Sequence, residues 1–193
     1  MTFAGVSGAS LQSFSCLPDH AGTGAGVNDP SGTGKAITKC TATLQKAATA
    51  FVKAKLGSLA KCVNTVLACR QLKPGVACLT KASDTCDKAF TKIASATTKL
   101  VSAVDKSCTE SVIAYASLRT TNAANLAALA TECAAHGVAN LDTLAQYETC
   151  LFRQHECRVE DLLRFEAPRA AELLQAVGHE LRSGFCPPRG ACP

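Results

Sequence analysis

Residues 62–86 read CVNTVLACRQLKPGVACLTKASDTC, and this stretch decides the fold. Its four cysteines lie symmetrically about Pro74-Gly75, the strongest turn signal in the region. Proline cannot continue the hydrogen bonding of a helix, and glycine suits the position of a type II turn that requires a positive φ. An antiparallel helical hairpin bent at this turn would place the cysteines opposite one another in pairs. The predicted disulfides are Cys62–Cys86 and Cys69–Cys78.

The same symmetry extends outward to Cys40 and Cys108, which we predict to form a third bond of the ladder. Apolar residues on both sides of the turn recur at steps of three and four, which predicts one buried stripe on each of two long helices. On the first arm the register of this stripe shifts by one residue near Lys55. The stripe residues are Ile37, Cys40, Leu44, Ala47, Phe51, Leu59, Cys62, Val66 and Cys69 on the first arm, and Cys86, Phe90, Ile93, Thr97, Leu100, Val104 and Cys108 on the second.

Charge divides the chain near residue 109. Residues 35–106 carry 13 Lys or Arg against 3 Asp or Glu, whereas residues 109–193 carry 7 Arg against 10 Asp or Glu. We therefore predict an all-α protein: a long antiparallel helical hairpin stapled by disulfides, followed by a smaller helical module. The expected units are a flexible Gly-rich segment over 1–34, the hairpin over 35–108, and the second module with an irregular C-terminal tail over 109–193.

The second module shows shorter helical patterns. Residues 109–120 are expected to be helix or connector, and a helix capped by Thr121 or Asn122 should end near Gly137. Asn140 should cap a long helix over 141–166, and Pro168 should lie in the first turn of a further helix that ends near residue 178 or 184.

The cysteines of the second module are harder to pair. Reflection about Pro168 places Cys150 opposite Cys186, which is the pair we predict. No partner follows from the pattern for Cys16, Cys133, Cys157 or Cys192. Cys16 and Cys192 both lie in terminal segments, where they could pair with each other or cross-link to a neighbouring molecule.

The twin pairs between Cys62 and Cys86 resemble those of CHCH domains, in which two disulfides staple two helices. The resemblance covers only this part of the chain, and six residues separate the cysteines of the first pair while seven separate those of the second. This spacing differs from that of the family, so the resemblance implies the stapled hairpin and not the family's function or compartment.

Twelve cysteines, an even number, predict disulfides and therefore an oxidising compartment: the extracellular space, the cell surface or the periplasm. Residues 1–15 contain no basic residue and no continuous apolar core, so they do not read as a signal peptide. We expect that a leader peptide has already been removed. No apolar run is long enough to predict a membrane span.

Neither catalysis nor metal binding is predicted. No two cysteines are closer than six residues apart, whereas structural zinc sites use ligand pairs separated by two to four residues. Phosphate-loop, zinc-protease and nucleophile-elbow motifs are not found. His155 lies between Cys150 and Cys157, but we interpret it as a polar residue on a helix flank. The sequence therefore predicts a non-enzymatic protein without a cofactor.

Lysines recur at seven-residue intervals on both arms and form the surface feature with most bearing on function. A solvated helix face is the usual interpretation. The alternative is contact with an anionic partner, such as surface polysaccharide, lipid head groups or nucleic acid. The candidate contact residues are Lys39, Lys46, Lys53, Lys81, Lys88, Lys92, Lys99 and Lys106.

The leading functional hypothesis is a secreted or periplasmic structural or interaction protein, for example a subunit of a surface assembly or filament that contacts other proteins or its own copies. The first alternative is a charge-driven binder of an anionic polymer that uses the lysine faces. The second alternative is a cytoplasmic protein whose cysteines are reduced and serve metal binding or redox chemistry.

Overall fold

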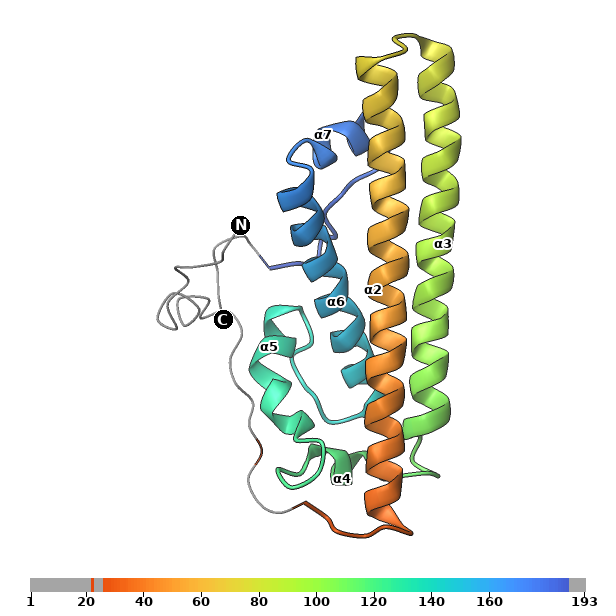
Figure 1. Ribbon diagram of the computed structural model, residues 1–193. Coiled ribbons are helices and arrows are strands. Elements are labelled where there is room, and N and C mark those ends of the chain that lie inside the picture. Colours follow the sequence, from red (N-terminus) through yellow and green to blue (C-terminus); the bar gives the residue numbers. More distant parts are fainter. Residues whose placement is uncertain (1–21, 23–25, 188–193) are drawn as a thin grey trace, which may run out of the picture.

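The computed structural model describes residue 22 and residues 26–187, and this part of the chain contains helices and no strand. The prediction of an all-α fold with a long stapled hairpin and a smaller helical module is confirmed. In Figure 1 the two long helices stand side by side and the shorter elements lie along one side of α2. The elements are α2 (Thr33–Gln71), α3 (Val76–Cys108), α4 (Tyr115–Arg119), the 3₁₀ helix η1 (Leu126–Leu129), α5 (Ala130–Ala135), α6 (Leu144–Glu166) and α7 (Ala170–Gln175).

Three disulfides join α2 to α3 at three heights, and they are the pairs that the cysteine spacing predicts. The base bond joins Cys40 to Cys108, the middle bond Cys62 to Cys86, and the tip bond Cys69 to Cys78. The Cα atoms of the pairs are 5.0, 4.8 and 5.7 Å apart, so the two helices keep close to one spacing along the hairpin. Buried small residues such as Ala48, Ala82 and Ala89 contribute to this close contact, because small side chains permit helices to approach closely.

The turn between the helices differs in detail from the prediction. Gly75 has a positive φ of +154°, as expected, but its ψ is +153°. The glycine of a type II turn has a ψ near 0°, so this turn is not of that type. Only glycine adopts the observed combination without strain, because any Cβ would crowd the neighbouring backbone.

The start of α2 is fixed by Asp29. Its carboxylate accepts hydrogen bonds from the backbone N–H groups of Gly32 (2.9 Å) and Thr33 (2.7 Å), which have no partner inside the helix. These two bonds lower the pKa of Asp29 below its usual value. The helix therefore begins two residues before the predicted boundary at residue 35, and the residues just before it serve as a cap.

The buried stripe of α2 is continuous, so the predicted register shift near Lys55 is wrong. Lys55 itself is a stripe residue with only 3% of its surface exposed, between the buried Phe51 and Leu59. Steps of four residues join all three positions. The predicted stripe of this arm contains only apolar residues and so omits Lys55, whereas in the structure this lysine is buried against carboxylates of α6.

Helix α6 is the main element that packs on the hairpin. Its Phe152 ring contacts Phe51 of α2 edge-on, with 5.7 Å between the centroids. The helix begins at Leu144 and is capped by Thr143, not by Asn140 as predicted. Thr143 and Gln146 form a capping box, in which each side chain bonds to the other residue's backbone N–H, so this pair satisfies the helix start better than Asn140 could.

The helices on either side of α6 are shorter than predicted. The helix expected from Thr121 or Asn122 is reduced to η1 and α5, which cover 126–135, and the chain turns at Gly137 with a φ of +75°. Pro168 lies before α7, not in its first turn. The chain then turns again at Gly178, where φ is +81°.

The predicted pair Cys150–Cys186 is wrong. Cys150 bonds to Cys133 of α5, and Cys186 bonds to Cys157, two turns further along α6. The prediction assumes a second hairpin reflected about Pro168. Instead, α5 lies beside the first half of α6, and the chain after the short α7 returns only as far as the second half. Cys16 and Cys192 lie outside the described residues.

The segment after α7 is also tied to the hairpin. The His179 ring stacks on Phe90 of α3 at 4.2 Å between centroids, and its Nε2 lies 3.0 Å from a carboxylate oxygen of Asp87. The second module therefore contacts both long helices. Among the described residues, no helix combines the length and the apolar character that crossing a membrane requires.

Candidate functional site

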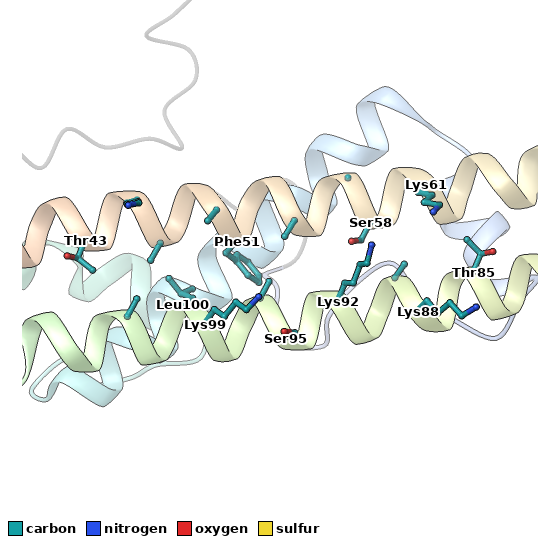
Figure 2. Close-up of a pocket in the computed structure, with 18 residues that line it drawn as sticks. Thr43, Phe51, Ser58, Lys61, Thr85, Lys88, Lys92, Ser95, Lys99 and Leu100 are labelled. Atoms are coloured by element: carbon teal, nitrogen blue, oxygen red, sulfur yellow. The ribbon is translucent and has the colours of Figure 1, made fainter.

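A long groove runs between α2 and α3 on the side of the hairpin away from α6. Figure 2 looks onto it, with the second module behind the two helices. Its volume is about 1100 Å³, and it extends from Thr43 to Lys61 on α2 and from Thr85 to Ala103 on α3. Nothing in the part of the chain that the structure describes covers it.

The floor of the groove is apolar and built mainly from small side chains. Only Phe51 and Leu100 are large, and both lie between the helices near the middle of the groove (Figure 2). Helical steps of three and four place the small residues on the same face as these two. They are Ala47, Ala50, Ala54 and Gly57 on α2, and Ala89, Ala96 and Ala103 on α3.

Lysines from both helices line the rim of the groove. Lys92 reaches from α3 toward Ser58 of α2 in Figure 2. Among the described residues that line the groove, none is acidic, so the positive charges are not neutralised locally. The rim lysines are Lys46, Lys61, Lys88, Lys92 and Lys99.

Four of the eight predicted contact lysines therefore meet at one site, and the other four do not line it. Lys61 was missed because it does not continue the seven-residue repeat of Lys46 and Lys53. The available signal was the spacing of small residues: Lys46, Ala50, Ala54, Gly57 and Lys61 follow one helical face. The predicted lysines outside the groove are Lys39, Lys53, Lys81 and Lys106.

A buried charge cluster joins α2 to α6. The Lys55 ammonium lies 2.8 Å from a carboxylate oxygen of Glu156 and 2.7 Å from one of Glu160, and it also donates to the backbone carbonyl of Glu156. Lys55 and Glu160 are 3% and 2% exposed, so both are removed from water. The three contacts use all three donors of the ammonium group.

Glu160 extends this cluster to the C-terminal segment. Its carboxylate accepts hydrogen bonds from the backbone N–H and the hydroxyl of Ser183, at 3.1 and 2.8 Å. Ser183 lies three residues before Cys186, which is bonded to Cys157 on the same helix as Glu160. The cluster is thus a structural junction of three segments, in which Lys55 and Glu160 have partners while one carboxylate oxygen of Glu156 is buried without a hydrogen bond.

A second buried polar region lies at the start of α6. Burial, and then the neighbouring carboxyl of Asp105, raise the pKa of Glu148 to about 7. Burial also raises the pKa of Tyr115 to about 12. Neither group lines the groove.

The histidine between Cys150 and Cys157 does not form a thiol–imidazole pair. The ring of His155 lies 2.8 Å from the carbonyl oxygen of Leu151, and burial lowers the pKa of the ring. Both cysteines are in disulfides. Among the described residues, no group of three or more His, Cys, Asp or Glu is arranged to hold a metal ion.

The groove is the site whose geometry can serve a partner outside the chain: an open, elongated apolar floor between two rows of unneutralised ammonium groups. Such a surface can bind an anionic partner by contact and charge together. Comparison with known proteins adds no further indication, because no family model, no curated protein and no solved structure matches this chain.

Proposed function

We propose that this protein is a non-enzymatic interaction protein of an oxidising compartment, and that it binds an anionic partner along the groove between α2 and α3. The observation that carries the proposal is the rim of five lysines over an apolar floor, without an acidic residue among the described lining residues. The disulfide ladder keeps the two helices at a fixed spacing, so the groove exists before the partner arrives. A preformed surface loses less entropy on binding than one that must be ordered.

The same ladder supports the proposed compartment. Five disulfides join cysteines within the described residues, and such bonds persist in the extracellular space, at the cell surface or in the periplasm. The rival proposal of a reduced cytoplasmic metal or redox protein is tested by counting thiols in the denatured protein. A count near twelve, the number of cysteines in the chain, would favour the rival.

Binding to poly-L-glutamate, a simple anionic probe, tests the groove. We expect affinity to fall steeply as salt rises from about 50 to about 200 mM, because bound counterions are released when charges pair. The double variant Lys92→Glu/Lys99→Glu reverses two rim charges. It should weaken binding by more than tenfold, which is a loss of more than about 1.4 kcal/mol.

The matched control, Lys53→Glu/Lys106→Glu, makes the same change in net charge at exposed positions outside the groove. It should weaken binding clearly less than the rim variant. Equal losses in the two variants would mean that net charge alone attracts the probe, and an affinity insensitive to salt would refute the proposal.

A second candidate function is assembly with further copies of the chain. It is favoured by the apolar tip of the hairpin, where Leu72 and Val76 are 75% and 82% exposed on either side of the turn. Sedimentation of the oxidised protein over a concentration series tests it. Association that Leu72→Ser/Val76→Ser removes would support it, and a strictly monomeric species at high concentration would count against it.

A further inference from the structure

We propose that the partner in the groove is an amphipathic α-helix of another protein, with a stripe of large apolar residues flanked by Glu or Asp. This inference rests on the proposed function and specifies the class of partner. It follows from the shape of the groove, the size of its floor residues, one glycine and the placement of the lysines.

The shape suits a helix. The groove lies between two antiparallel helices and extends over residues 43–61 of α2, which is about 27 Å at the rise of an α-helix. A third helix of roughly 18 residues has the same length and can pack along both neighbours at once. On the other side of the hairpin, α6 already shows that a helix packs on this scaffold (Figure 1).

The floor suits the large side chains of such a helix. The distance between packed helices depends on the side chains at their contact, and a floor of alanine and glycine permits a close approach. Pockets for small apolar molecules are instead enclosed and lined mainly by large apolar and aromatic side chains. Here Phe51 and Leu100 are the large apolar residues, and the groove is open along its length.

Gly57 is the residue that the hairpin alone does not explain. Glycine in the interior of a helix destabilises it relative to alanine. Gly57 is exposed, and a Cβ placed on it would meet no atom within 4 Å. Nothing in the described chain therefore requires glycine here. A partner whose backbone or large side chain comes close to α2 at this point would require it, and Gly57 lines the groove.

The rim lysines determine which charges the partner helix has to carry. They lie on both sides of the apolar floor, as the flanking charged positions of a helix bundle lie on both sides of its apolar seam. A helix with carboxylates beside its apolar stripe would pair with Lys46 and Lys61 on one side and with Lys88, Lys92 and Lys99 on the other. A second copy that presented this same groove would instead place lysine against lysine, which is unfavourable.

The experiment uses the full oxidised protein and two labelled peptides of equal composition, followed by fluorescence anisotropy. The ordered peptide carries Leu at the two seam positions of each heptad and Glu at the flanking positions. The scrambled peptide has the same residues and charge without a continuous apolar face. We expect the ordered peptide to bind at least tenfold more tightly than the scrambled one.

Gly57 variants separate a partner contact from a structural role. Gly57→Ala should raise the melting temperature of the free protein and weaken binding of the ordered peptide about threefold to tenfold, and Gly57→Leu should weaken it further. The matched control is Thr49→Leu, which places the same large side chain at an exposed position of α2 outside the groove. It should leave the affinity unchanged.

Each failure has a distinct meaning. If both peptides bind equally, or if Gly57→Leu binds the ordered peptide as the wild type does, the helix proposal is wrong while the anion-binding proposal stands. Binding to anionic phospholipid vesicles but to neither peptide would assign the groove to lipid, and self-association abolished by Gly57→Leu would assign it to a second copy. If no anionic probe binds, the proposed function itself is wrong.

Discussion

The buried ammonium of Lys55 offers a quantitative test of how the second module is held on the hairpin. Replacement by methionine keeps most of the aliphatic chain of Lys55 and removes the charge. The carboxylate of Glu160, 2% exposed, would then have no cation beside it, and that of Glu156, 14% exposed, would have to turn toward water. The change therefore leaves at least one negative charge in the interior without a compensating cation.

The expected cost follows from this burial. Removal of one partner of a buried ion pair destabilises a protein by about 3–5 kcal/mol, because the remaining charge is no longer compensated. Ser183 still donates two hydrogen bonds to Glu160, which partly stabilises the carboxylate. We therefore expect Lys55→Met to lower the free energy of unfolding by about 3 kcal/mol, the low end of that range.

Urea denaturation under non-reducing conditions, followed by circular dichroism, measures this cost. The companion variants are Glu160→Gln and the double variant Lys55→Met/Glu160→Gln. Because the amide is neutral, the double variant should recover at least about 1.5 kcal/mol relative to Lys55→Met alone. Glu160→Gln alone should be destabilising, since it leaves Lys55 with one carboxylate instead of two.

Two results would refute the reasoning. A loss below about 1 kcal/mol for Lys55→Met would place the ion cluster in the range of exposed ion pairs. Additive losses in the double variant would mean that Lys55 and Glu160 do not stabilise one another, whatever the distance between their charged atoms.

Three further outcomes are expected. Removal of the base bond by Cys40→Ser/Cys108→Ser should cost about 4 kcal/mol and more than removal of the tip bond. With the middle bond in place, the base bond closes a loop of about 44 residues, 22 on each helix, and the tip bond one of 9. Equal urea midpoints for the two variants would contradict this. The pKa of Glu148 is raised to about 7 from 4.5, so this carboxyl stabilises the fold fully below pH 4.5 and that contribution is lost as pH rises through 7. Glu148→Gln should remove this part of the pH dependence and stabilise the protein at alkaline pH, and an unchanged pH profile in urea denaturation would contradict it. Thr143→Ala should lower the free energy of unfolding by about 1 kcal/mol through loss of the α6 cap, and no change in the urea midpoint would show that Gln146 alone suffices.

The hairpin could be predicted from the sequence because its determinants are local and repeated. Cysteine positions symmetric about Pro74-Gly75 admit few arrangements, and a stripe with helical steps fixes the face that each cysteine occupies. The second module lacks both constraints. Its pairs depend on where α5 and the segment after α7 return to α6, and that geometry is set by long-range packing, so the Cys150–Cys186 prediction failed.

The candidate site could be predicted only in part. The seven-residue spacing identified lysines on the helix faces, but which of them share a groove depends on how α2 and α3 are rotated about their axes. Lys55 shows a second kind of error, in which a residue type that is usually exposed is buried. Composition alone treats a lysine as a surface residue, and only the position of Glu156 and Glu160 on a helix 101 and more residues away reveals a buried one.

The nested disulfides also determine how the protein responds to proteases. A single cut at any peptide bond between Cys40 and Cys108 leaves the two products joined by at least one of the three disulfides between α2 and α3. Detachment of a fragment requires at least two cuts, for example one on each helix between the base bond and the middle bond. A nicked molecule therefore remains covalently whole, and damage to its exposed lysine-rich surface would be visible on a gel only after reduction.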